Sequence, residues 1–152
     1  MSDPGRRAWI GAGALCALVV ALDQIAKALV EANLVAGEHV DLLGPLGLTL
    51  AHNRGVAFGL ASGGGAVLVA LTLVALAFVA VLFARNPERP GMWIAVGLLA
   101  GGALGNLIDR VRLGEVTDYI DLLSWPPFNV ADIAVTLGVV VLALTYIGEV
   151  DR

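Results

Sequence analysis

Two carboxylates in this chain, Asp118 and Asp132, have the residue type and the position to do acid–base chemistry. Asp118 follows Val-Thr, and Asp132 is the only charged residue in the apolar stretch 128–147. A carboxylate within lipid costs about 2.5 kcal/mol or more, so it needs a partner or a function. Two carboxylates held close together share one proton, because both cannot ionise at that distance. Such a pair can take a proton from water and give one to a carbonyl oxygen or a leaving amine.

The segment between the two acids contains Trp-Pro-Pro-Phe (125–128). The two prolines prevent one continuous helix from Asp118 to Asp132. We therefore expect the chain to fold back here and to set the two carboxylates face to face. The alternative is that each acid is paired separately.

A second polar group ends the apolar run that precedes Asp118. Asn106, Asp109 and Arg110 follow one another at i, i+3 and i+4, so we expect them to project from one face of a helix. The Arg110 guanidinium could bind a peptide carbonyl or an anchored ligand while Asp109 holds it in place. The alternative is a local or solvated ion pair.

Two further polar pairs lie earlier in the chain. Asn53 and Gly55 belong to a polar, glycine-containing loop, and the Asn53 amide can both donate to and accept from an extended peptide backbone. Asp23 and Lys27 lie four residues apart on one helix face, which is typical of an ion pair that lets both charges tolerate the membrane interface. The second pair is either structural or helps to shape the site.

The composition indicates an integral membrane protein. The chain has 152 residues, of which 59% are hydrophobic and 14% charged, with a net charge of -4. A soluble domain of this size needs more polar surface. Crossing ~30 Å of hydrocarbon takes ~20 apolar residues in a helix. We predict one all-α membrane domain, with spans at 8–27, 63–83, 92–108 and 128–147.

Arginine and lysine predict the orientation. Positive charges on the side of both termini are Arg6, Arg7, Arg85, Arg89 and Arg152, and those on the other side are Lys27, Arg54, Arg110 and Arg112. The short turn 84–91 carries two of the arginines, which favours a cytoplasmic location for that side and for both termini. The long connections 34–62 and 109–127 then lie outside the cytoplasm.

Two local patterns predict how the elements pack. Leu46, Leu48 and Leu50 alternate with smaller or polar residues, so we predict a short β-hairpin or curved sheet on the membrane surface, between the first two spans. In the third span, glycines recur every four residues, at positions 97, 101 and 105. This spacing places them on one face of the helix, as a glycine stripe that favours the close approach of another helix.

Metal, cofactor and nucleic-acid functions find no support in the sequence. His39 with Asp41, and His52, are the only candidates for a histidine-based metal site, and they lack the spacing of a zinc motif. No basic run is present that would bind nucleic acid. We expect no metal and no cofactor.

The motifs in this order resemble the bacterial lipoprotein signal peptidases (signal peptidase II), a family of intramembrane aspartyl proteases. Four segments carry the resemblance: Asp23-Gln24-x-x-Lys27; Asn53-x-Gly55-x-Ala57-Phe58-Gly59; Gly101-Gly-x-x-Gly-Asn-x-x-Asp-Arg110 with Gly114-x-Val116-x-Asp118; and Phe128-Asn-x-Ala-Asp132. Val56 stands where alanine is common, and Tyr119 stands where phenylalanine is usual. Neither departure touches an ionisable position of the motifs.

The resemblance implies roles for these residues. Asp118 and Asp132 would be the catalytic dyad. The residues that would line the site and orient the substrate are Asn53, Gly55, Asn106, Arg110 and Asn129. Asp109 would support Arg110, with Asp23 and Lys27 as further supporting residues. The substrates would be prolipoproteins in membrane lipid whose cysteine carries a diacylglyceryl group, cut just before that cysteine. The family acts at the outer face of the cytoplasmic membrane without a cofactor, is blocked by globomycin-type inhibitors, and would not require an oligomer.

Two other functions fit parts of the sequence. A small transporter or channel could use Asp23, Lys27 and Asp132 as an ion or proton path. The chain has no inverted repeat, which argues against this class. A non-enzymatic membrane assembly factor could use the glycine stripe as its partner surface, and would tolerate neutralisation of both candidate acids.

Overall fold

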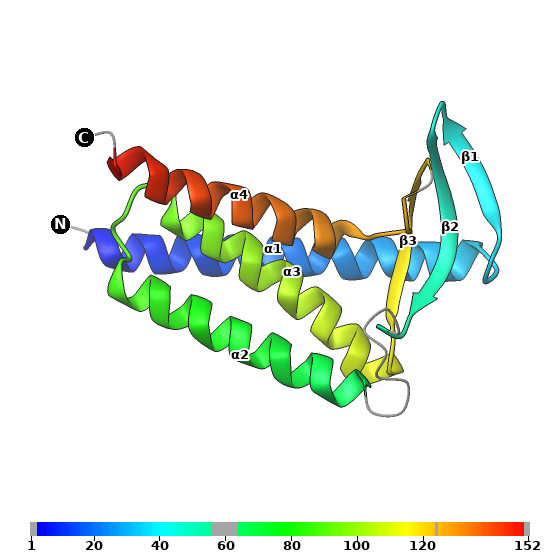
Figure 1. Ribbon diagram of the computed structural model, residues 1–152, viewed down its shortest axis with the longest axis horizontal. Helices are drawn as coiled ribbons and strands as arrows, with labels where there is room; N and C mark the ends of the chain where they lie inside the picture. Colours follow the sequence, from blue (N-terminus) through cyan, green and yellow to red (C-terminus); the bar gives the residue numbers. More distant parts are fainter. Residues whose placement is uncertain (1–2, 56–63, 124, 151–152) are drawn as a thin grey trace.

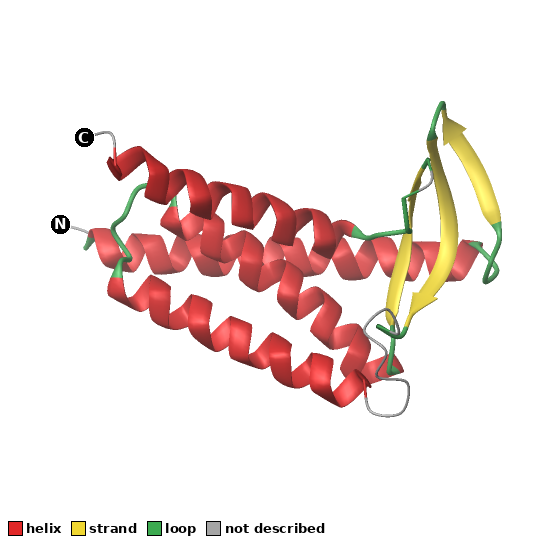
Figure 2. Cartoon of the chain, viewed as in Figure 1, coloured by secondary structure: helices red, strands yellow, loops and turns green. Residues whose placement is uncertain are grey.

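In the part of the chain that the structure describes, four long helices run side by side, and a small antiparallel sheet lies at one end of them (Figures 1 and 2). The computed structural model describes residues 3–55, 64–123 and 125–150. The elements in chain order are α1 (Pro4–Asn33), β1 (His39–Leu43), β2 (Leu46–Asn53), α2 (Gly64–Arg85), α3 (Met92–Leu113), β3 (Val116–Leu122) and α4 (Val130–Val150). Both termini lie at the end of the helices opposite the sheet (Figure 1).

The four helices are long and apolar enough to cross a membrane, so the predicted fold class is confirmed. The bounds differ from the predictions. α1 extends beyond 8–27 at both ends, α3 continues past 108 to Leu113, and residue 63 of the second predicted span lies outside the described residues. α4 begins at Val130, two residues later than predicted. Hydropathy locates the apolar centre of a span but not the polar last turns, which capping groups decide.

The central helix of the bundle is α3, which is the most buried of the four, whereas α2 is the least buried. The predicted glycine stripe on α3 is where α1 approaches. A Cβ added at Gly97 would lie 3.0 Å from the Ala12 carbonyl oxygen, and one at Gly101 would lie 3.0 Å from that of Cys16. This close approach is what brings polar side chains of α1 and α3 together further along.

The sheet has the order β1-β2-β3, and both pairings are antiparallel. The hairpin of β1 and β2 lies in the predicted region between the first two spans, which confirms that prediction. β3 joins from the connection between α3 and α4, and it was not predicted as a strand. Its pairing places Asp118 opposite Ala51 of β2, a contact between distant parts of the chain that no local pattern reveals.

Two local features turn the chain between α3, β3 and α4. Gly114 adopts φ 78° and donates its N–H to the Arg110 carbonyl at 3.1 Å, which ends α3 in the left-handed conformation that suits glycine. After β3, the predicted break at Pro126-Pro127 allows Phe128 to return beside the strand. The Ile120 N–H donates to the Phe128 carbonyl at 2.8 Å, and the Phe128 N–H donates to the Ile120 carbonyl at 3.0 Å.

Candidate active site

Asn129 connects the two candidate acids. Its side-chain Nδ2 donates to Asp118 Oδ1 at 2.7 Å, and its backbone N–H donates to Asp132 Oδ2 at 3.2 Å. Asp118 comes from β3 and Asp132 from the first turn of α4. The structure therefore brings both carboxylates to one place at the sheet end of the bundle, as the fold-back at Pro126-Pro127 predicts.

The start of α4 is a reciprocal cap between Asn129 and Asp132. The Asp132 N–H donates to Asn129 Oδ1 at 2.9 Å, while the Asn129 N–H donates to Asp132 Oδ2. This is the capping-box arrangement, in which two side chains three residues apart satisfy backbone donors that the first turn leaves free. The spacing Asn-x-x-Asp is visible in the sequence and could have predicted that the helix begins at Val130. Phe128 and Asn129 therefore precede the fourth span.

Asp118 is almost fully buried, and both of its oxygens accept hydrogen bonds. Asn53 Nδ2 donates to Asp118 Oδ2 at 3.1 Å, and Asn129 Nδ2 donates to Oδ1. Burial raises the pKa of Asp118 to about 6, and the negative charge of Asp132 adds to the rise. The two amide donors and the more distant Lys27 ammonium hold this pKa down. A carboxyl group with this pKa can exchange a proton near neutral pH.

Asn106 of α3 is the second amide of the site. Its Nδ2 donates to Asp132 Oδ1 at 2.8 Å, and its Oδ1 accepts from Asn129 Nδ2 at 3.1 Å. The same Oδ1 accepts from Lys27 Nζ at 3.1 Å. Because lysine can only donate, it fixes which end of the Asn106 amide faces Asp132.

Lys27 lies at the centre of a buried charge cluster. The predicted pair with Asp23 forms at 2.8 Å, and a second ion pair joins Lys27 to Asp109 at 2.6 Å. Asp23 Oδ1 also accepts the Ala131 N–H at 3.0 Å, so α1 binds the N-terminus of α4 directly. A buried ion pair is tolerated only when its remaining hydrogen bonds are satisfied, as these are.

Arg110 does not join this cluster. Asp109 contacts Lys27, the Gln24 side chain at 2.9 Å and the Thr117 N–H at 3.3 Å. Arg110 is half-buried and forms no ion pair with the residues that the structure describes. The expectation that Asp109 holds Arg110 is therefore wrong for this structure. The physical reason is that consecutive helix residues do not face each other, so Asp109 points into the bundle and Arg110 does not.

Asn53 and Gly55 form the rim of the site at the end of β2. The Gly55 N–H donates to Asn53 Oδ1 at 2.8 Å, which leaves the Asn53 Nδ2 group for Asp118. Gly55 has φ +70°, and an added Cβ would clash with the Leu68 side chain, so only glycine suits this turn. The motif positions Ala57, Phe58 and Gly59 lie outside the described residues.

Sequence reasoning missed two partners of the site, the half-buried Gln24 and the fully buried Thr117. Gln24 donates to Asp109, to Asp23 at 3.3 Å and to the Gly105 carbonyl at 3.3 Å, and it appeared in the motif only as a neighbour of Asp23. Thr117, which is 0% exposed, precedes Asp118 and gave no signal of its own because threonine is common in strands.

Two hollows flank the two acids. One has a volume of about 300 Å³ and is mainly apolar; its lining residues are Trp125, Phe128, Asp132, Ile133, Thr136 and Leu137. The other has a volume of about 410 Å³ and lies toward the sheet; its lining residues are Ala51, His52, Asn53, Arg54, Asp118, Pro126 and Pro127. An extended substrate could therefore approach the acids from the side of α4 and from the side of β2.

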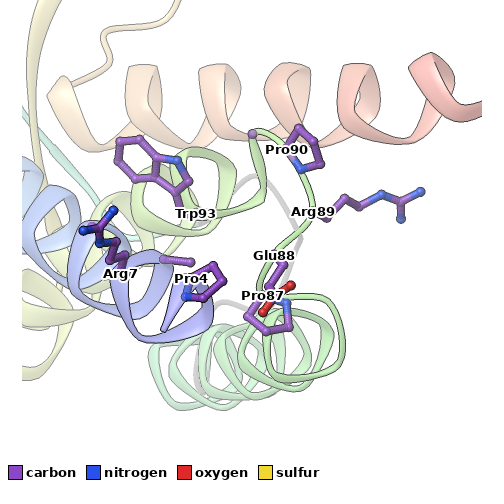
Figure 3. Close-up of a pocket in the computed structure, with 10 residues that line it drawn as sticks. Pro4, Arg7, Pro87, Glu88, Arg89, Pro90 and Trp93 are labelled. Carbon is purple, nitrogen blue, oxygen red and sulfur yellow. The ribbon is translucent and has the colours of Figure 1, made fainter. Parts of the chain in front are cut away.

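A further hollow of about 430 Å³ lies at the opposite end, between the first turns of α1 and the 86–91 connection. Figure 3 shows the Arg7 and Arg89 side chains pointing away from each other there. Arg89 instead stacks on the Tyr146 ring, with Cζ 3.7 Å from the centroid. Polar groups do not converge in this hollow, so we do not assign it as the active site.

The imidazole of His39 lies between two carboxylates on the sheet, 3.0 Å from Asp41 and 3.2 Å from Asp121. Within residues 3–55, 64–123 and 125–150, no group of three His, Cys, Asp or Glu side chains is arranged to hold a metal ion. The site described above consists of acids, amides and one lysine.

The fold and the site define a polytopic membrane protein with a buried polar centre at the sheet end of its helices. The model of the family "Signal peptidase (SPase) II" matches residues 15–148. The lipoprotein signal peptidase of Moorella thermoacetica is 43% identical over 130 residues, which are 84% of this chain and 87% of that protein. That of Halothermothrix orenii is 38% identical over 128 residues, covering 84% of this chain and 88% of its own length.

A solved structure described as a bacterial membrane enzyme, at 1.9 Å resolution, has the same fold. It superposes with a TM-score of 0.84 and 31% sequence identity, covering 89% of this chain and 91% of the other. The chain belongs to the signal peptidase II family. It is therefore a membrane-bound peptidase, which disfavours the transporter and assembly-factor hypotheses.

Proposed function

We propose that this chain is a membrane aspartyl endopeptidase that removes the signal peptide from diacylglyceryl-modified prolipoproteins. It cleaves the peptide bond just before the lipidated cysteine. The observation that carries the proposal is the joint binding of Asp118 and Asp132 by Asn129. Family membership supports the substrate class, because the curated relatives are lipoprotein signal peptidases.

The two acids divide the proton transfers of hydrolysis. Asp118, whose pKa burial raises to about 6, holds the proton that the pair shares. The partner carboxylate, Asp132, takes a proton from water as the water oxygen bonds to the scissile carbonyl carbon, and Asp118 gives its proton to the carbonyl oxygen. When the C–N bond breaks, Asp132 passes the proton taken from water to the leaving amine, and Asp118 regains a proton from the diol as the new carboxyl group forms. Asn106 and Asn129 keep both carboxylates oriented throughout.

The surroundings of the dyad suit a substrate with one lipid part and one peptide part. The apolar hollow beside Asp132 is lined by Ile133 and Leu137 of a membrane-spanning helix, where acyl chains can remain in lipid. The Arg110 guanidinium and the second N–H of the Asn53 amide supply donors for the carbonyl groups of an extended peptide, whereas the fully buried Asn129 amide is bound to the dyad. The reaction requires no metal, no cofactor and no second copy of the chain.

We place both termini in the cytoplasm and the dyad toward the outer face of the bacterial cytoplasmic membrane. Both termini and the arginine-bearing 86–91 connection lie at the end of the helices opposite the sheet (Figure 1). Short arginine-bearing connections favour the cytoplasmic side. The peptide bond would then be cut at the surface where a translocated lipoprotein emerges.

The test is cleavage of a diacylglyceryl-modified precursor by purified enzyme, followed by a mobility shift on a gel, with and without globomycin. We expect no product from Asp118→Asn or Asp132→Asn, and normal cleavage by Asp121→Asn. Asp121 is a matched control because it lies on the same strand and contacts His39, away from Asn129. Normal turnover by either dyad variant would refute the assignment.

A further inference from the structure

Thr117, the residue before Asp118, is 0% exposed, and its three polar groups bind residues from three different segments of the chain. Its N–H donates to Asp109 Oδ2 of α3 at 3.3 Å, and its carbonyl accepts from Asn129 Nδ2 at 3.3 Å. Its hydroxyl donates to Glu31 Oε1 of α1 at 2.6 Å.

Only the hydroxyl bond of Thr117 depends on the side chain. Any residue except proline at position 117 would offer the backbone N–H and carbonyl, but only serine or threonine carries a hydroxyl group on Cβ. Glu31 is exposed at the last turns of α1, so its carboxylate remains solvated while it accepts the short bond. A hydrogen bond to a charged group is about twice as strong as a neutral one. Neither Thr117 nor Glu31 belongs to the motif positions quoted above.

The placement of Asp118 depends on this bond, because one peptide unit separates it from Thr117. The carboxylate of Asp118 must meet Asn53 from β2 and Asn129 from the segment before α4. β3 is the last strand of the sheet: β2 pairs with it on one side, and Phe128 forms an isolated bridge with Ile120. The bond to Glu31 fixes the strand against α1, a membrane-spanning helix, and so fixes its position relative to the dyad partner.

We propose that Thr117, anchored by Glu31, is a positioning residue that sets Asp118 within the catalytic pair. This inference rests on the proposed function of the dyad. It adds two residues that act through Asp118 and do not touch the substrate. A displacement of a reacting group by about 1 Å can lower a rate about 100-fold.

The experiment measures kcat, KM and the pH profile of kcat/KM with a lipidated precursor, for Thr117→Val and Thr117→Ser. Valine keeps the shape and the backbone bonds but loses the donor, and serine keeps the donor. We expect Thr117→Val to lower kcat about tenfold with KM within about twofold, and Thr117→Ser to remain close to the wild type. The matched control is Thr145→Val, whose hydroxyl donates to Val141 within α4 near the opposite end of the bundle.

The pH profile separates positioning from stability alone. Displacement of Asp118 weakens its bonds from Asn53 and Asn129, which hold its pKa down. The basic limb of kcat/KM is therefore expected to move to higher pH in Thr117→Val. A variant that unfolds at a lower temperature but keeps the wild-type kcat and pH limb would overturn the proposal.

Variants of Glu31 test the same hydrogen bond independently if Thr117→Val does not fold. Glu31→Gln keeps the accepting oxygen, whereas Glu31→Ala removes it. The glutamine variant keeps a weaker, neutral hydrogen bond, so we expect its kcat to lie closer to that of the wild type, whereas the alanine variant repeats the tenfold loss. Equal kcat values for these two variants would overturn the proposal. Asp118→Asn in the same assay distinguishes the two proposals. If Asp118→Asn still cleaves the precursor, the catalytic dyad is refuted. If Asp118→Asn is inactive while Thr117→Val has a normal kcat, only the positioning role of Thr117 is refuted.

Discussion

Lys27 Nζ lies 2.6 Å from Asp109 Oδ2, and each of these side chains is 4% exposed. The contact joins α1 to α3 at the level of the dyad and is shared with Asp23, which binds the start of α4. One cation is thus shared by two buried carboxylates from two different helices. Its removal leaves charge without compensation in a place that water does not reach.

Lys27→Met is expected to destabilise the folded protein by about 3–5 kcal/mol, the usual cost of breaking a buried ion pair. The measurement is thermal unfolding of the purified protein in detergent. Arg54→Met is the control, because the Arg54–Glu115 pair is exposed on its arginine side and such pairs contribute little. Equal unfolding temperatures for the two variants would contradict the proposed contribution of Lys27 to the stability of the folded protein.

Asn129→Ala is expected to lower kcat by about 100-fold or more, because one side chain orients both acids and caps α4. Cleavage of the lipidated precursor measures the effect. Asn33→Ala is a matched control: among the described residues, the Asn33 amide donates to the Leu29 carbonyl in the last turn of α1, away from the dyad. A loss confined to KM would show that Asn129 binds the substrate and does not orient the dyad.

Asn53→Ala is expected to move the basic limb of kcat/KM to higher pH. The Asn53 amide stabilises the charged form of Asp118, so its loss raises a pKa that is already about 6. If Asp118 must carry the shared proton, activity declines as the pH rises through the pKa of Asp118. In Asn53→Ala, Asp118 then stays protonated, and the enzyme active, to a higher pH. A shift of the basic limb toward lower pH would contradict the prediction, because it would mean that the Asn53 amide raises the pKa of Asp118.

The raised pKa of Asp118 also predicts how stability depends on pH. The folded protein binds this proton more tightly than the unfolded chain, whose carboxyl has the ordinary value of 3.8. The resulting stabilisation is complete below that ordinary value and is lost as the pH rises through about 6. Asp118→Asn cannot ionise, so its stability relative to the wild type should increase across this window. Unfolding midpoints at pH 5 and pH 8 test the prediction, and an unchanged difference would contradict it.

Gly101→Ala is expected to cost about 1–3 kcal/mol, because the added methyl group meets Val19 and the Cys16 carbonyl of α1. Gly13→Ala is the matched control, since nothing lies within 4 Å of its added Cβ. Alanine there even improves helix propensity. Thermal unfolding of both variants measures the difference, and a stable Gly101→Ala would show that α1 and α3 tolerate separation.

Several parts of the fold follow from short stretches of sequence. The four helices follow from apolar composition, because only a segment that satisfies its own backbone can cross lipid. The break at Pro126-Pro127 and the close approach of another helix at the glycine stripe are equally local. The capping spacing of Asn129 and Asp132 is also local, and it predicts a start at Val130 that hydropathy alone does not.

Composition and hydropathy specify the membrane class, the segments that cross lipid and the few polar residues that need partners there. The partners themselves follow from the assembled fold: Asp109 binds Lys27 rather than Arg110, β3 pairs with β2, and Thr117 binds Glu31. Hydropathy and periodicity are properties of one segment. The partner of a buried charge depends on which distant segments are packed within about 3 Å of it, and that is fixed only when the helices and the sheet assemble.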